Sequence, residues 1–368
     1  MKVLLIAQIN SIFTYELVSN IKQKNNNICF NIYSPNPDKN PEKHTKLFEK
    51  IFSPKHKFHQ IRILKTILNV ISLFIFIFKT KKKYDYIHVL FVDYLTYFNI
   101  FFFKRISKNT IITIYGSDFY KLNKLQKIFF RKAIKISDNV TCTNDDINSK
   151  ISLKLKKTNV KTIRFGLTPL QYINKFLKKE ISLNFEEIKD KFVIICGYNG
   201  YRNNNHIQVI EALNKIKKHL PKNYIIVFQM TYGIDLNYTL KIKKLLKEYC
   251  LKYMFINDFL SYERLSSLRI CSNLAILPLE TDSFSGTVQE YLYTENVLIS
   301  GSWLPYDLFK KKGVYYETID NFEDLPEKIK YCINNYDMLK EKTKINKQII
   351  WKLSSWDSNI DNWINLYK

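Results

Sequence analysis

Short apolar runs alternate with stretches of helical periodicity along the whole chain. Runs bounded by polar, glycine or proline residues are typical of buried strands. We predict strands at residues 2–7, 28–33, 86–91, 110–115, 139–143, 160–165, 192–196, 224–229, 253–256, 274–277 and 296–300. Helical periodicity lies between them, at 12–24, 125–137, 207–220, 239–250 and 287–293, with some helix also expected at 45–52. This alternation predicts an α/β protein with two Rossmann-like, doubly wound parallel sheets facing a cleft.

The same pattern sets the expected domain boundaries. Residues 1–180 form an N-terminal domain and 181–345 a C-terminal domain, and a terminal helix at 346–368 packs back toward the first. At 368 residues, with 46% hydrophobic and 15% aromatic residues, the chain is long enough for two cores.

The most apolar segment, 61–83, leaves two interpretations open. Its apolar core, 67–78, is shorter than the ~20 residues that a membrane-spanning helix needs. The segment is either a helix buried against the sheet or a helix in the membrane interface, with flanking lysines at 79–83. Residues 94–103 are again apolar and aromatic, and Lys104 and Arg105 follow them.

Charge and cysteine content narrow the possible partners and the compartment. Lys and Arg total 58 against 33 acidic residues, for a net charge of +25. Part of this positive excess reflects codon bias, because the chain is rich in the Lys, Asn and Ile that AT-rich coding favours. The rest suits an anionic membrane surface or a nucleotide substrate. No zinc-finger or RNA-binding motif is present, so we expect no nucleic-acid partner. The six cysteines are far apart, which fits a reducing compartment, and the run at 2–7 is too short for a signal peptide.

Residues 271–305 hold the strongest candidate chemistry. A strand at 274–277 ends at Pro278, and a polar loop leads to a helix at 287–293. A loop that enters a helix N-terminus can bind phosphate, although an ordinary βαβ turn has the same pattern. Asp282 and Glu290 flank this loop eight residues apart.

Two further strand ends carry candidate residues. Gly197, Gly200 and Arg202 follow the strand at 192–196, without the spacing of a dinucleotide or Walker motif. Asp118 follows the strand at 110–115, where ligands of parallel sheets bind, and it either faces the cleft or caps the next helix.

Taken together, these segments resemble GT-B glycosyltransferases, particularly the retaining nucleotide-sugar transferases of family 4. The resemblance covers nearly the whole chain and rests on KVLLIA, YDYIHVL, TIYGSD, VIICGYNGYRNNNHIQVIEAL, YIIVFQM, MFINDFLSYERL, NLAILPL and DSFSGTVQE. Asp282 and Glu290 match the two acids of the family's E-x7-E motif, the first as a shorter side chain. GYNGYRNNNH and TDSFSGTVQEYLY are also similar to bacterial 4-acetamido-fucosyl transferases of surface-polysaccharide assembly, which leaves retention or inversion open.

The resemblance implies a set of site residues and roles. Glu290 bonds the ribose of the donor, and Asp282 approaches the donor sugar. The implied catalytic residues are Asp282, Asp118 and Tyr115. The implied donor-binding residues are Gly197, Asn199, Gly200, Arg202, His206, Asp258, Pro278, Ser283, Phe284, Ser285, Gly286, Thr287 and Glu290. The implied acceptor-side residues are Asn10, Ser11, Gly116 and Ser117.

Three departures from the family pattern qualify these roles. Tyr198 stands where the family has an arginine, so diphosphate binding depends more on the amides of residues 285–287. The glycine-rich loop after the first strand is absent, and Tyr115 replaces a histidine. A non-catalytic GT-B-like binding or partner subunit is therefore the alternative.

The expected function follows from the resemblance. It is transfer of a hexosyl-type sugar from a UDP-, GDP- or TDP-sugar, with no cofactor or metal, to a lipid-linked or oligosaccharide acceptor. The pathway would be bacterial lipopolysaccharide or capsule synthesis, in the cytoplasm at the inner face of the membrane. Residues 61–83 and 94–105 are expected to face that membrane. An epimerase is less favoured, because no Tyr-x-x-x-Lys with an NAD fingerprint is present.

Overall fold

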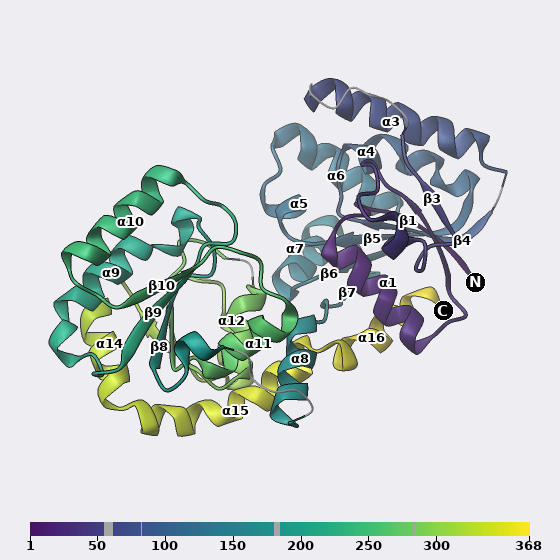
Figure 1. The fold of residues 1–368 in the computed structure, drawn as a ribbon. Coiled ribbons are helices and arrows are strands. Elements are labelled where there is room, and N and C mark those ends of the chain that lie inside the picture. Colours follow the sequence, from purple (N-terminus) through teal and green to yellow (C-terminus); the bar gives the residue numbers. More distant parts are fainter. Residues whose placement is uncertain (55–61, 82, 180–184, 283) are drawn as a thin grey trace. The chain divides into compact units, whose positions relative to one another are not determined.

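The computed structural model describes residues 1–54, 62–81, 83–179, 185–282 and 284–368, which form two compact units (Figure 1). The first unit comprises Met1–Gly166 and Asn359–Lys368, and the second comprises Leu167–Ser358. The expected boundary between 180 and 181 lies outside the described residues. The tail forms two helices, α15 (Tyr336–Ser354) and α16 (Trp356–Ile364), because the backbone at Ser355 is extended.

The first unit is built on a parallel seven-stranded sheet with the order β3-β2-β1-β4-β5-β6-β7. Its strands are β1 (Lys2–Ile6), β2 (Cys29–Tyr33), β3 (Lys50–Phe52), β4 (Tyr84–Leu90), β5 (Ser107–Ile114), β6 (Asn139–Cys142) and β7 (Val160–Thr162). The order reverses between β1 and β4, and ligands of such sheets bind outside the carboxyl ends of the strands at this switch point.

The helices of the first unit follow the predicted alternation. They are α1 (Ile12–Lys24), α2 (Pro41–His44), α3 (Arg62–Lys79), α4 (Tyr94–Asn99), α5 (Ser117–Tyr120), α6 (Lys124–Ile136), α7 (Asp145–Leu155) and the 3-10 helix η1 (Ile100–Arg105). The helix expected at 45–52 is wrong. The segment instead ends in the edge strand β3, which pairs with Asn31–Tyr33 of β2 and is too short to show a period of its own.

Helix α3 settles which face of the 61–83 segment is buried. Leu73 and Ile77 are fully buried in the core of the first unit, whereas Ile63, Ile67 and Ile71 are half to three-quarters exposed. The helix packs on α4 and η1 and lies along one side of the unit (Figure 1). In the described part of the chain, no helix has both the length and the apolar character needed to cross a membrane.

The second unit repeats the same topology with six parallel strands in the order β10-β9-β8-β11-β12-β13. Its strands are β8 (Phe192–Cys196), β9 (Tyr224–Gln229), β10 (Tyr253–Ile256), β11 (Leu274–Leu277), β12 (Val297–Gly301) and β13 (Glu317–Ile319). Its α-helices, besides α15, are α8 (Thr168–Leu177), α9 (His206–Lys215), α10 (Leu236–Glu248), α11 (Tyr262–Cys271), α12 (Gly286–Tyr293), α13 (Asp307–Lys312) and α14 (Leu325–Asn334). The switch point lies between β8 and β11.

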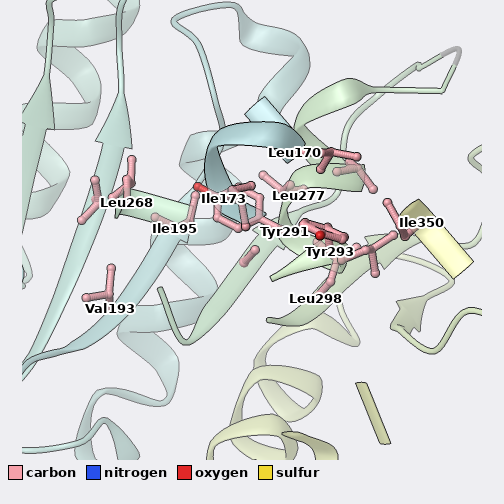
Figure 2. Close-up of a cluster of buried hydrophobic side chains, with 14 of the residues drawn as sticks. Leu170, Ile173, Val193, Ile195, Leu268, Leu277, Tyr291, Tyr293, Leu298 and Ile350 are labelled. Atoms are coloured by element: carbon pink, nitrogen blue, oxygen red, sulfur yellow. The ribbon is translucent and has the colours of Figure 1, made fainter. Parts of the chain in front are cut away.

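One buried cluster explains where the second unit begins. Figure 2 shows Leu170 and Ile173 of α8 packed with Ile195 of β8, Leu277 of β11 and Tyr291 of α12. Helix α8 therefore belongs to the second core, although the sequence placed it in the first domain. Both sheets follow the Rossmann strand order, which confirms the predicted pair of parallel-sheet domains.

Candidate functional site

Two loops meet at the switch point of the second unit, one after β8 and one after β11. The Asn203 side chain accepts a hydrogen bond from Thr281 N at 2.9 Å and donates one to Thr281 O at 3.1 Å. Asn205 Nδ2 donates to the carbonyl of Pro278 at 2.7 Å. The asparagines of the sequence NNN thus fasten the two site loops to each other, a contribution that the sequence did not reveal.

The loop after β8 has its path fixed by Gly197 and Asn199. Gly197 has φ +70, and a Cβ there would lie 2.5 Å from Nε2 of His206. The buried Asn199 accepts hydrogen bonds from Tyr201 N at 2.9 Å and from Asn204 Nδ2 at 2.7 Å. Gly200 approaches the backbone of residues 232–234, since its Cβ would be 3.1 Å from the carbonyl of Gly233. These predicted donor-binding residues shape the loop.

The two basic side chains of this loop are not available as free cations. Arg202 pairs with Asp235, with its Nε at 3.1 Å and its second nitrogen at 2.7 Å from one carboxylate oxygen. Burial lowers the pKa of His206 to about 4, so the imidazole is neutral at physiological pH. A diphosphate at this site therefore has to rely on other donors or displace Asp235.

Glu290 is a buried carboxylate on the inner side of α12. It is 6% exposed, and its Oε2 accepts a hydrogen bond from Arg269 Nε at 2.9 Å. Arg269, on α11 and 2% exposed, also donates to Gln229 Oε1 at 2.7 Å and to the hydroxyl of Tyr291 at 2.6 Å. Burial alone would lower the pKa of Arg269, but Tyr291 and Glu290 beside it hold that pKa above its ordinary value.

Arg269 pairs with Glu290 and orients its carboxylate. The other carboxylate oxygen, Oε1, lies toward Gly286, where a Cβ would stand 3.9 Å away. The Leu167 side chain lies on the same side, since its Cδ2 would be 3.1 Å from that Cβ, so a larger residue at position 286 would crowd Leu167. Sequence reasoning missed Arg269, because nothing in the segment SYERLSSLRI indicates that this arginine points inward.

Asp282 fixes the turn that leads into α12. Its Oδ2 accepts hydrogen bonds from Ser285 N at 2.7 Å and from the hydroxyl of Tyr306. Phe284 has φ +98, and Ser283 lies outside the described residues. The amide of Ser285 is thus occupied, whereas Gly286 and Thr287 begin the helix, where amides have no intrahelical acceptor and the dipole is positive.

Exposed aromatic residues follow β9 and β10 at the same end of the sheet. Phe259 is 76% exposed and stacks on Tyr232, with ring centroids 6.0 Å apart and an interplanar angle of 3°. Asp258, a predicted donor-binding residue, is exposed directly before Phe259. The sequence analysis did not single out these two rings.

The first unit carries its own cavity, of about 410 Å³, at the switch point between β1 and β4. Its lining comes from the loops after β1, β2 and β4, from helices α3, α4, α5 and α6, and from the turn between α5 and α6. It consists of Gln8, Pro35, Asn36, Lys65, Thr66, Asn69, Phe91, Val92, Asp93, Tyr94, Leu95, Tyr97, Ser117, Asp118, Lys121, Leu122 and Gln126. Two of the predicted residues, Ser117 and Asp118, line it, and Gln8 takes part where Asn10 and Ser11 were expected.

Two carboxylates border this cavity. Asp118, 3% exposed, accepts three backbone hydrogen bonds, from Val92 N at 3.0 Å, Tyr115 N at 2.9 Å and Gly116 N at 2.8 Å. It therefore joins the loops after β4 and β5, and burial raises its pKa. Asp93 caps α4 through Leu95 N at 3.0 Å, and burial raises the pKa of Asp93 to about 6. Asp93 was not predicted.

Other site residues predicted in the first unit make packing or hydrogen-bond contacts that hold that unit together. The Tyr115 ring packs 5.5 Å from Phe13 and 5.1 Å from Phe165, and burial raises its pKa far above that of a free tyrosine. Asn10 bonds the loop at Lys39 N, 3.0 Å away, and at Pro37 O, 2.8 Å away. Gly116 has φ +134, which requires glycine at the end of β5.

His88, from the strand YDYIHVL, is fully buried in the first unit. It lies 2.6 Å from the Tyr367 hydroxyl through Nδ1 and 2.6 Å from Thr113 Oγ1 through Nε2. Burial lowers its pKa to about 3. Among the described residues, no group of three His, Cys, Asp or Glu side chains is placed to hold a metal ion.

Comparisons with known proteins bear on both units. Residues 2–144 match the family described as Glycosyl transferase 4-like. A search of curated proteins found no match. Three of the solved structures that align with 100% of this chain illustrate the range of proteins with this fold. A glycosyltransferase from Rickettsia africae has a TM-score of 0.72 and 14% identity over 97% of its own chain. Anabaena HepE in complex with UDP-glucose has a TM-score of 0.68 and 11% identity over 99%.

The third structure limits what the shared fold says about the reaction. UDP-GlcNAc 2-epimerase from Neisseria meningitidis, bound to UDP-GlcNAc, has a TM-score of 0.68 and 14% identity over 99% of its chain. Because one fold here serves different reactions, these likenesses establish architecture and not chemistry. The chain has the GT-B fold, and its first domain matches a glycosyltransferase family over residues 2–144.

Proposed function

We propose that this protein is a glycosyltransferase that moves a hexosyl-type sugar from a nucleotide sugar to a lipid-linked or oligosaccharide acceptor of surface-polysaccharide synthesis. The observation that carries the proposal is Glu290, a buried carboxylate paired with Arg269 at the switch point of the second sheet. The family match of the first domain and the fold shared with a UDP-glucose complex support it.

The geometry suggests how a donor would be bound. Oε1 of Glu290 can accept a hydrogen bond from a ribose hydroxyl, while Oε2 stays with Arg269. The amides of Gly286 and Thr287 and the positive end of α12 would stabilise the diphosphate as its charge develops. Asp282, fixed by Ser285 N and Tyr306, would lie beside the donor sugar.

Release of nucleotide from a panel of UDP-, GDP- and TDP-sugars tests this proposal. Glu290→Gln keeps an acceptor for Arg269 but removes the charge that strengthens the ribose hydrogen bond. A lost charge-assisted bond is worth about 1.5–3 kcal/mol, so kcat/KM should fall roughly 10- to 150-fold. The matched control is Glu280→Gln, which neutralises an exposed carboxylate of the loop that precedes α12. Equal kcat/KM for the two variants would contradict the assignment.

A non-catalytic GT-B-like binding or partner subunit is the second candidate. It is favoured by the ion pair that occupies Arg202 and by the neutral His206, which leave the loop after β8 without a free cation. Wild-type protein that binds a nucleotide sugar in a thermal-shift assay, yet releases no nucleotide with any acceptor extract, would support this candidate instead.

We further propose that the protein works at the inner face of a bacterial membrane. The outer α3 surface, defined as the exposed Phe74 and Phe78 and the half-buried Phe102, places aromatic rings beside one another. Phe74 and Phe78 are 4.5 Å apart, and Arg105 lies 4.8 Å from the Phe78 ring. Aromatic rings surrounded by basic residues are typical of proteins that adsorb to anionic lipid.

Liposome co-sedimentation tests the membrane proposal. Replacing Lys79, Lys81 and Lys83 by Glu should remove binding to anionic vesicles. Each lysine near the surface contributes about 1 kcal/mol of binding free energy, and each glutamate adds repulsion from the anionic lipid. The matched control replaces the exposed Lys241, Lys243 and Lys244 of α10 by Glu, which makes the same change in net charge. If both triple variants lose the same amount of binding, only net charge matters and the surface is not a membrane contact.

A further inference from the structure

Tyr306 stands at the start of α13, and packing fixes its ring. It is 1% exposed, and its ring centroid lies 5.2 Å from that of Phe309 and 6.4 Å from that of Tyr316. The amide of Tyr306 donates to the carbonyl of Leu304 at 2.7 Å, so the backbone at this position is held as well. From this fixed ring, the hydroxyl donates a hydrogen bond to Oδ2 of Asp282 in the loop before α12.

The hydroxyl of Tyr306 is a permanent donor to this carboxyl group. Burial and the negative charge of Asp282 raise the pKa of Tyr306 far above that of a free tyrosine, so the hydroxyl keeps its proton. Hydrogen bonds to a charged acceptor are about twice as strong as those between neutral groups. Both hydrogen bonds that the described residues make to Asp282, from Tyr306 and from Ser285 N at 2.7 Å, end on Oδ2, and Oδ1 lies outside them.

Helix α13 supports the same loop at a second point. Phe284, two residues after Asp282, has φ +98, a conformation that is strained for a bulky side chain. Its ring packs on Phe309 of α13, with centroids 4.8 Å apart. Phe309 and Tyr306 are neighbours at the start of α13, since Phe309 N donates to Tyr306 O at 2.9 Å. One rigid element therefore holds two residues of the loop and sets the direction of the Asp282 side chain.

The Tyr306 hydroxyl also limits the length of the acid at position 282. A glutamate there would carry its carboxylate about 1.5 Å farther from the backbone, the length of one carbon–carbon bond. Along the direction of the present side chain, that shift runs into the hydroxyl, and the ring is packed too closely to retreat. The short acid and the tyrosine fit each other, whereas the E-x7-E motif has a longer acid at this position.

We propose that Tyr306 is a positioning residue of the transfer reaction, whose hydroxyl sets how far the Asp282 carboxylate reaches toward the donor sugar. This inference rests on the proposed function, in which Asp282 lies beside that sugar. Tyr306 acts only through Asp282. Because a misplacement of about 1 Å at a reacting centre costs roughly 100-fold in rate, we expect the tyrosine to affect turnover more than donor binding.

Steady-state nucleotide release, measured with the donor that the wild type uses, tests this role. Tyr306→Phe keeps the ring and its packing and removes only the hydroxyl. Loss of a charge-assisted hydrogen bond should lower kcat by about 10- to 150-fold, while KM for the donor changes by less than about threefold. The matched control is Tyr316→Phe, which removes the hydroxyl of a neighbouring ring in the same cluster and should leave kcat unchanged. Thermal melts of the same preparations establish that both variants are folded.

A pair of length variants separates positioning from a purely structural role. Asp282→Glu alone should lower kcat at least about 100-fold, because its carboxylate is displaced by about 1.5 Å. Asp282→Glu/Tyr306→Phe should recover at least about tenfold of that loss, because removal of the hydroxyl makes room for the longer acid. A structural role of Tyr306 predicts the opposite, namely that the second substitution lowers kcat further.

The outcomes distinguish this inference from the proposed function. Turnover that depends on Glu290 but is equal in Tyr306→Phe and Tyr316→Phe would overturn the positioning role and leave the transferase proposal standing. Losses that multiply in Asp282→Glu/Tyr306→Phe would also overturn the positioning role alone. A folded wild type that releases no nucleotide from any donor would contradict both proposals.

Discussion

Removal of Glu290 should destabilise the second unit because it leaves a buried guanidinium without its counter-charge. Arg269 is 2% exposed and cannot reach bulk water. In Glu290→Ala it would keep two neutral acceptors, Gln229 Oε1 at 2.7 Å and the Tyr291 hydroxyl at 2.6 Å, but no anion. Removing one partner of a buried ion pair costs about 3–5 kcal/mol.

The expected size of the effect follows from the size of the unit. In domains of 150–250 residues, 1 kcal/mol shifts the melting temperature by about 2–4 °C. Glu290→Ala should therefore lower the melting transition of the second unit by roughly 6–20 °C. Arg269→Met should destabilise the second unit by a similar amount, since it leaves the buried Glu290 carboxylate without its counter-charge. The double variant Arg269→Met/Glu290→Leu should lose at least about 2 kcal/mol less than the sum of the two single changes.

Scanning calorimetry of the full chain measures these losses, because the two units can melt as separate transitions. Glu280→Ala, which removes an exposed carboxylate of the loop before α12, is the control and should leave both transitions unchanged. Strictly additive losses in the double variant, or a shift of Glu290→Ala no larger than that of Glu280→Ala, would refute the ion-pair argument.

Three further predictions concern the scaffold. The folded pKa of His88 is about 3 and an unfolded histidine titrates near 6.5, so the unfolded chain binds more protons than the folded chain below pH 6.5. The free energy of unfolding should therefore fall by up to about 1.4 kcal/mol per pH unit between pH 6.5 and 3. Denaturant titrations at several pH values should show that this free energy depends less steeply on pH in His88→Gln. Gly197→Ala should cost about 1–3 kcal/mol in thermal melts, because its Cβ would meet His206; Gly313→Ala, with φ +79 and open space around it, should cost less, and equal losses would contradict the contact. Deletion of residues 359–368 removes the buried Trp363 and Tyr367 from the first unit and should expose that unit, but not the second, to limited proteolysis.

The pattern of apolar runs was sufficient for most of the fold. Strands β8, β9, β10 and β11 have the predicted bounds, because buried parallel strands are continuous apolar runs that sequence alone displays. The short edge strands β3 and β13 were missed, since three residues carry little pattern of their own, whereas β7 was predicted within the longer segment 160–165. The placement of α8 in the second core also escaped prediction, because amphipathic periodicity shows that a helix buries one face and not which sheet it covers.

For the candidate site, the sequence by itself determined which strand ends carry the candidate residues. It located Glu290, Asp282 and the glycine loop after β8, because parallel strands bring their carboxyl ends to one edge of the sheet. Only the tertiary structure decided what these residues contact. It placed Arg269 against Glu290, paired Arg202 with Asp235, and formed a cavity that Asp93 and Asp118 line. Hydrogen bonds and ion pairs between elements far apart in sequence depend on side-chain directions, and those are set only when the elements pack.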